Sequence, residues 1–216
     1  MTSRASLRTS LRTVRQDRRG LALVEFAFAL PILMLLCLTG AEIVNYITTR
    51  MRISQLALHI ADNAARMGTG PAITAKSVSE TDINDVLTGG GLQAGDLNLY
   101  ANGRVVLTDL EPVANPNTTD KYKVGWIRCR GAKSYTSPYA RVGQTNMVGI
   151  GPADTQVKAQ DFNATMFVEV TFTYTPLVLA SLAPSTTITE IASMAVRDRR
   201  DLTQIYNLEG AAVSTC

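Results

Sequence analysis

The amino-acid sequence predicts an α+β protein in which one long N-terminal helix packs on an antiparallel sheet of about five strands. Three observations support this fold class. An apolar run covers residues 21–38, and a helical pattern of apolar residues continues to residue 67. Later segments alternate apolar and polar side chains, which is typical of β-strands. The length of 216 residues suits one globular unit with an appendage.

The positive charge of the chain is concentrated at its N-terminus. Residues 1–20 have a net charge of +5, whereas residues 21–216 have a net charge of −2. The basic residues of this leader are Arg4, Arg8, Arg12, Arg15, Arg18 and Arg19. Because no basic patch or DNA-reading motif follows, we expect no binding to nucleic acid.

The apolar run predicts a membrane-spanning helix. Only Glu25 and Pro31 interrupt it between residues 21 and 38, and about 20 residues are enough to cross a bilayer. Under the positive-inside rule the arginine-rich leader stays in the cytoplasm and everything after Thr48 lies across the membrane. The sequence thus divides into a leader at 1–20, a transmembrane helix at 21–47, an amphipathic helix at 48–70 and a head at 71–216.

Two kinds of cleaved signal fit this N-terminus less well than an anchor does. A secretory signal has a shorter apolar core that ends in small residues, and the residues LTG at 38–40 are a poor version of that ending. A twin-arginine signal is suggested by Arg18 and Arg19, but the run that follows is too hydrophobic. An uncleaved anchor stays open as an alternative, because it explains the arginines and the apolar run although it does not explain Glu25.

Glu25 is the residue of the run that needs an explanation. An ionised side chain at the centre of a membrane helix costs about 2.5 to 3.5 kcal/mol, so such a residue is a functional candidate by default. The alternative is that Glu25, about one and a half turns into the helix, reaches the cytoplasmic interface and has no function.

Residues 18–36, with the sequence RRGLALVEFAFALPILMLL, resemble the N-terminus of TadE-like pseudopilins of the bacterial tight-adherence (Tad, or Flp) type IV pilus system. The resemblance extends to residue 67. Because a membrane peptidase cuts such proteins after a glycine, it implies that Gly20 precedes the cleaved bond and Leu21 becomes the new N-terminus. It also implies that Glu25 acts in assembly. Phe26 stands where major pilins have tyrosine, which together with the large head points to a minor pseudopilin.

The resemblance implies a pilin-like fold, no enzymatic activity and a location in the bacterial inner membrane, with the head in the periplasm or carried into a pilus. The implied partners are the prepilin peptidase, other pilins and pseudopilins, and an inner-membrane assembly platform. Cleavage would create an α-amino group at Leu21, and Glu25 of a neighbouring subunit could pair with it, because a buried carboxylate is tolerated beside a cation. This pairing would set the stagger between subunits.

The head begins with two expected helices. Apolar residues at three- and four-residue spacings predict an amphipathic helix that ends before the sequence GTGP at 68–71. Ser79 and Asp82 have the spacing of a capping box, which predicts a second helix that ends at the glycines of residues 89–91.

The expected strands follow. Asn102-Gly103 lies between two β-prone runs and predicts a hairpin. Residues 121–130 predict a strand with Tyr122, Val124 and Trp126 on one face. Residues 166–174 alternate cleanly, and a last strand is expected within 186–197. Such a sheet can lay its apolar face on the amphipathic helix and form two layers, with residues 131–160 as a long surface loop.

Two of the three cysteines are candidates for a disulfide. Cys129 and Cys216 both lie on the oxidising side of the predicted membrane, whereas Cys37 lies in the apolar run and is expected to pack there. A Cys129–Cys216 bridge would stabilise the head by about 4 to 5 kcal/mol in the loop-entropy model. A free Cys216 or an intermolecular bridge stays open as an alternative.

The sequence offers no catalytic or metal-binding constellation, so we expect no enzyme and no cofactor. His59 is the only histidine, and no nucleophile motif accompanies it. The glycines at 89–91 lack the lysine and hydroxyl residue of a phosphate-binding loop. Asn115, Asn117 and Asp120 depart from the calcium-loop pattern. An anchored ligand-binding or enzymatic ectodomain is the remaining alternative, and a convergent polar pocket in the head would favour it.

Overall fold

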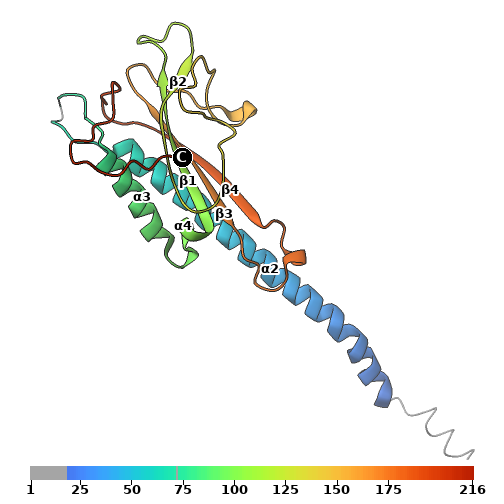
Figure 1. The fold of residues 1–216 in the computed structure, drawn as a ribbon. Coiled ribbons are helices and arrows are strands. Elements are labelled where there is room, and N and C mark those ends of the chain that lie inside the picture. The colour runs from blue at the N-terminus through green and yellow to red at the C-terminus, as the bar shows by residue number, and fades with distance from the viewer. Residues whose placement is uncertain (1–18, 72) are drawn as a thin grey trace, which may run out of the picture.

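The computed structural model describes residues 19–71 and 73–216, which form one long helix with a head folded around its C-terminal half (Figure 1). In chain order the main elements are α2 (Arg19–Arg66), α3 (Glu80–Ala94), α4 (Leu99–Asn102), β1 (Gly103–Pro112), β2 (Tyr122–Arg130), β3 (Thr165–Thr173), the 3-10 turn η3 (Ala180–Leu182) and β4 (Thr187–Ala195). The predicted α+β class is confirmed, with a sheet of four strands where about five were expected.

Helix α2 is continuous over 48 residues, including Pro31, and is about 72 Å long at 1.5 Å per residue. Its first part, residues 20–38, is exposed throughout and projects from the head (Figure 1). Its second part is buried on one face at the spacing that the sequence predicts; the fully buried apolar residues there are Ile53, Ala57, Ile60, Ala61, Ala64 and Ala65. One helix therefore supplies both an exposed apolar rod and the centre of the core.

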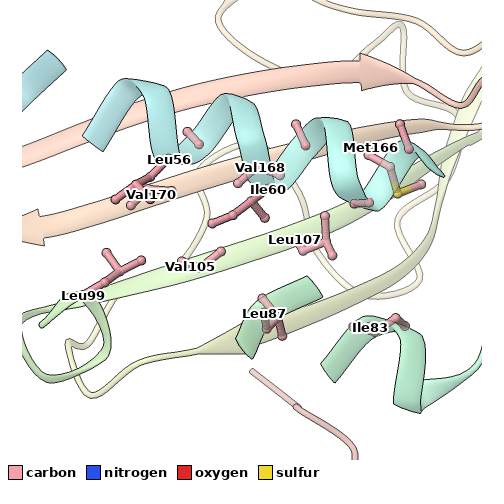
Figure 2. Close-up of a cluster of buried hydrophobic side chains, with 14 of the residues drawn as sticks. Leu56, Ile60, Ile83, Leu87, Leu99, Val105, Leu107, Met166, Val168 and Val170 are labelled. Carbon is pink, nitrogen blue, oxygen red and sulfur yellow. The ribbon is translucent and has the colours of Figure 1, made fainter. Parts of the chain in front are cut away.

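The sheet has the order β2-β1-β3-β4, and all neighbouring strands are antiparallel. Helix α2 packs on β3 and β4, and α3 packs beside α2. As predicted, alternate residues of β3 point into the core between sheet and helices, among them Met166, Val168 and Val170 (Figure 2). Leu56 and Ile60 of α2 meet them there, with Leu87 of α3 close by (Figure 2).

The hairpin predicted at Asn102-Gly103 is wrong. Residues Leu99–Asn102 form the helical turn α4, and β1 starts at Gly103. A type I′ hairpin needs positive φ at both central residues, but Gly103 has an extended backbone with φ −148°. The apolar residue that suggested a strand, Leu99, is instead buried in the core, so burial of its side chain in a short helix overrides the local turn signal.

Helix α3 starts as predicted but ends later than predicted. Ser79 and Asp82 form both hydrogen bonds of the capping box, and the helix then continues through the glycines to Ala94. Two of these glycines are needed for close packing. A Cβ at Gly90 would lie 2.7 Å from Ile60 Cδ1, and one at Gly91 would lie 2.5 Å from Tyr100 Cε2. The glycines therefore admit neighbouring side chains and do not terminate the helix.

The predicted face of β2 is also partly wrong. Tyr122 and Val124 belong to the core on the far side of the sheet, whereas Trp126 packs on the core that contains α2. The pairing of β2 with β1 shifts register between Asp109 and Leu110, opposite Gly125. A β-bulge adds one residue to a strand and turns the following side chains to the other face, so the simple alternation fails at this point.

The segment 131–160 is not merely a surface loop. Four of its hydrophobic side chains are buried against the second face of the sheet, in one cluster with residues such as Val106 and Phe167; they are Ala140, Met147, Ile150 and Ala159. The head consequently has three layers over most of the sheet, with helices on one face and this irregular segment on the other. The expected two-layer arrangement is corrected by this second core.

Candidate functional site

The residues that the sequence marks for processing and assembly lie together on the projecting part of α2. Gly20, Leu21, Glu25 and Phe26 are all exposed. Leu21 and Glu25 are one helical turn apart, so their side chains lie on the same side of the helix. The whole helix is long and apolar enough to cross a membrane. The head buries none of residues 20–38, which leaves this apolar surface available to lipid or to other helices.

A second carboxylate in the apolar part of α2, Glu42, has the opposite environment. Its side chain has no exposed surface. Tyr174 Oη donates a hydrogen bond to Glu42 Oε1 at 2.5 Å, and the backbone N–H of Val178 donates to Oε2 at 2.7 Å. The loop between β3 and β4 therefore contacts α2 at this residue and satisfies a carboxylate that would otherwise be buried without partners.

Further contacts surround Glu42 and fix the position at which α2 leaves the head. Asn45 Nδ2 donates to Tyr174 Oη at 2.8 Å, and the rings of Tyr46 and Tyr174 meet edge to face with centroids 5.2 Å apart. About two turns beyond Glu42 on α2, Arg50 Nε lies 2.6 Å from Glu190 Oε1 of β4. We refer to Glu42, Asn45, Tyr46 and Tyr174 as the collar.

Sequence reasoning did not find the collar. Glu42 reads there only as an interruption between two apolar stretches, because its partners are 132 and 136 residues away in the chain. The available signal is weak: a carboxylate on a helix that is apolar on both sides needs hydrogen-bond donors from somewhere. The sequence does not show which segment supplies them.

The head also contains a buried carboxyl pair. Asp109 and Glu111 lie on β1, and Gly125 of the bulged strand covers them, since a Cβ there would lie 2.5 Å from Asp109 Oδ2 and 2.6 Å from Glu111 Oε1. Burial, together with the charge of Glu111 and a hydrogen bond to it, raises the pKa of Asp109 well above its usual range. Among the described residues, Asp109 Oδ1 has no hydrogen-bond partner.

These two residues line a cavity of about 460 Å³. Its other charged groups are paired within the chain. Lys123 Nζ lies 3.0 Å from Glu111 Oε2. Arg200 donates to the carbonyl oxygens of Ala64 at 3.0 Å and Met67 at 2.9 Å, at the C-terminal end of α2. The cavity is thus polar but close to neutral, and among the described residues no group of three or more potential metal ligands occurs.

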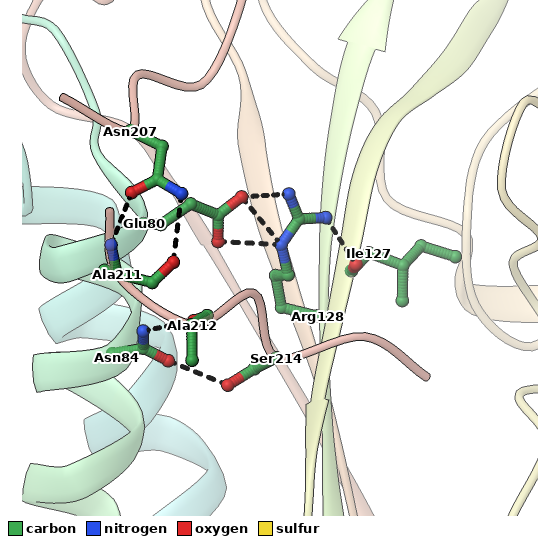
Figure 3. Close-up of polar contacts among 8 residues, drawn as sticks. All are labelled: Glu80, Asn84, Ile127, Arg128, Asn207, Ala211, Ala212 and Ser214. Atoms are coloured by element: carbon green, nitrogen blue, oxygen red, sulfur yellow. Dashed lines mark hydrogen bonds and ion pairs between the residues drawn. The ribbon is translucent and has the colours of Figure 1, made fainter. Parts of the chain in front are cut away.

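The disulfide between Cys129 and Cys216 is present, with the two Cα atoms 4.9 Å apart. It fastens the C-terminal segment along the outer edge of β2, where the N–H of Cys129 donates to the carbonyl of Ser214 at 2.8 Å. Asn84 of α3 holds the same segment: its amide donates to Ala212 O at 2.7 Å and accepts from Ser214 Oγ at 2.7 Å (Figure 3). This segment therefore covers part of the outer edge of β2.

An ion pair between Glu80 and Arg128 joins α3 to β2 next to this segment (Figure 3). Arg128 Nε lies 3.1 and 3.0 Å from the two carboxylate oxygens of Glu80, and both side chains are largely buried. The Arg128 guanidinium also lies over the Trp126 ring, 6.0 Å from its centroid. These contacts stabilise the rim of the cavity.

The remaining residues that sequence reasoning weighed lie apart from one another. His59 is exposed on α2, in a shallow groove shared with Arg52 and Gln93. Asp120 pairs with Lys158 at 2.5 Å and accepts from Tyr122 Oη at 2.9 Å, so its carboxylate oxygens are already in use.

Comparison with known proteins finds no match, whether with family models, curated proteins or solved structures. The most unusual feature of the structure is α2, which is exposed and apolar over its first half. Where the head begins, Tyr174 binds it through the collar.

Proposed function

We propose that this chain is a membrane-anchored minor pseudopilin that takes part in assembly of a Tad-type pilus. The observation that carries the proposal is the division of α2 into an exposed apolar half and a half that forms the core of the head. A fibre subunit needs such a helix, because the apolar half must pass from lipid to a bundle of similar helices while the head stays folded.

Glu25 has the surroundings that this function requires. It is exposed on the projecting half of α2, and no residue of the described part of the head pairs with its carboxylate. In a helix bundle an ionised carboxylate needs a cation, and the α-amino group of Leu21 in a neighbouring subunit would provide one after cleavage behind Gly20. The partners proposed on this basis are the prepilin peptidase, other pilins and pseudopilins, and the inner-membrane assembly platform.

The first test is the mature N-terminus. The protein is purified from its native membranes with and without the prepilin peptidase, and its intact mass and N-terminal sequence are measured. A chain that begins at Leu21 only when the peptidase is present supports the proposal. A chain that keeps Arg18 and Arg19 overturns it and favours an uncleaved, membrane-anchored scaffold of the same apparatus, for which the exposed apolar helix is equally suited.

The second test separates assembly from cleavage. Glu25→Ala should be cleaved normally but should reduce the number of pili, because the contact between Glu25 and the α-amino group of Leu21 in a neighbouring subunit is lost. Asp154→Ala, which removes an exposed carboxylate of the head, is the control and should leave pili unchanged. Wild-type numbers of pili with Glu25→Ala would contradict the assigned role of Glu25.

A further inference from the structure

The loop that joins β3 to β4 has an unusual composition and position. Between Glu169 and Glu190 the chain has no charged residue, and the loop contains the apolar sequence PLVLASLA at 176–183. Leu177 and Leu179 expose 65% and 58% of their surface. We propose that this loop is a second membrane contact, which dips into the outer interface of the bilayer beside α2. The inference rests on the proposed membrane anchor and adds a lipid-binding surface to the head.

The length of α2 places the loop at the right depth. At 1.5 Å per residue Gly20 and Glu42 lie about 33 Å apart along the helix, and the hydrocarbon core of a bilayer is about 30 Å thick. With Gly20 at the inner boundary, Glu42 therefore lies at the outer boundary. The hydrogen bond from the N–H of Val178 to Glu42, 2.7 Å long, holds the loop at that same level.

The distribution of charge supports the same boundary. In α2, Glu42 is the only charged residue between Glu25 and Arg50. Tyr174 of the collar and the backbone N–H of Val178 satisfy its carboxylate internally, so no charged group of α2 itself faces outward between Glu25 and Arg50. Along α2 the first exposed charge above Glu42 is that of Arg50, about 12 Å further along the helix, where it pairs with Glu190. On the sheet, Lys133 lies nearer to the loop, where its ammonium donates to Thr173 and Thr187 and marks the polar side of the boundary.

The side chains of the band are those that membrane interfaces favour. Tyr46, which is half-buried, has an apolar ring with a polar end, and such residues are enriched at the level of the lipid headgroups. Tyr174 is buried against Glu42 and does not face outward. Exposed leucines in a loop without charged residues gain free energy by entering the boundary between headgroups and acyl chains, at a depth of about 5 to 10 Å. In water the same leucines would remain hydrated, so lipid is the occupant that fits this surface.

The consequence is attachment of the head at two points. Helix α2 alone would allow the head to rotate about the membrane normal and to tilt. With the loop inserted as well, one side of the head, the end of the sheet where β3 turns into β4, faces the bilayer (Figure 1). The opposite end, with the residues around Leu208, then faces away from the membrane.

The experiment measures the depth of single tryptophans in the full chain, reconstituted into vesicles of phosphatidylcholine and phosphatidylglycerol with brominated acyl chains. Trp126→Phe removes the only native tryptophan. In this background Leu179→Trp, and separately Leu177→Trp, report on the loop. Leu33→Trp reports on the anchor, and Leu208→Trp, at a residue with 92% exposure in the head, is the control. Circular dichroism verifies that each variant is folded.

We expect the brominated lipids to remove most of the fluorescence of Leu33→Trp and of both loop variants and to leave that of Leu208→Trp unchanged. Quenching at Leu33 without quenching at Leu177 and Leu179 would overturn the loop contact and leave the anchor intact. Absence of quenching at Leu33 would overturn the anchor and the loop contact with it.

Discussion

Asp109→Asn tests the protonation state of the buried carboxyl pair. Burial and the neighbouring Glu111 raise the pKa of Asp109 in the folded head, whereas in the unfolded chain the pKa is about 3.9. As the pH rises above this value, the unfolded chain releases the proton and the folded head retains it. The free energy of unfolding therefore falls with pH, by about 1.4 kcal/mol per pH unit, until the pH passes the folded-state pKa.

The asparagine variant lacks this dependence, because its amide does not titrate and can still donate a hydrogen bond to Glu111. The free energy of unfolding of Asp109→Asn should therefore increase relative to that of the wild type as the pH rises, by about 1.4 kcal/mol per pH unit, until the pH passes the folded-state pKa of Asp109. The charges that face Asp109 from other elements, Lys123 and Arg200, are unchanged in the variant and oppose the shift in the wild type.

The assay is urea unfolding of the full chain in detergent micelles, followed by Trp126 fluorescence at a series of pH values from 5 to 8. Asp154→Asn, at an exposed position of the head, is the matched control and should follow the wild type. If the difference between Asp109→Asn and the wild type stays constant over the whole series, Asp109 is ionised in the folded head and the reasoning is refuted.

Two further predictions concern the stability of the head. Cys216→Ala opens the disulfide, whose cysteines are 87 residues apart, and should lower the free energy of unfolding by about 4 to 5 kcal/mol in the loop-entropy model. The control Cys37→Ala, at an exposed cysteine, should change the free energy of unfolding little. Equal unfolding midpoints for the two variants would contradict this prediction. Gly89→Ala and Gly90→Ala form a matched pair inside α3. The new methyl group of Gly89→Ala meets no atom within 4 Å and should stabilise the head by about 0.5 to 1 kcal/mol. The methyl group of Gly90→Ala lies against Ile60, so this variant should lose the same gain to overpacking. A higher midpoint of thermal unfolding for Gly90→Ala than for Gly89→Ala would contradict the packing described.

The long helix and the regular strands were predictable because their signals are local. The three- and four-residue spacing of apolar residues in α2 and the alternation in β3 each follow from a single element that buries one face. The capping box at Ser79 is equally local and is present as predicted. Local patterns of this kind are sufficient for the fold class.

The errors occur where a distant segment decides the structure. The face of Trp126 depends on a bulge at Gly125 that makes room for carboxylates on another strand. The end of α3 depends on Ile60 and Tyr100, which pack against its glycines. The burial of Glu42 depends on hydrogen-bond donors that lie more than 130 residues further along the chain. No window of neighbouring residues contains that information.

The continuity of α2 has a mechanical consequence. The part that projects from the head and the part that forms its core belong to one rod, so a pull along the helix reaches the contacts with β3 and β4 directly, with no linker to stretch first. Helix α2 runs along the sheet (Figure 1) and packs on β3 and β4, and such a pull therefore loads these contacts together in shear instead of peeling them apart one by one. A force applied to the projecting part of α2 is thus transmitted to the whole head, which moves together with the helix.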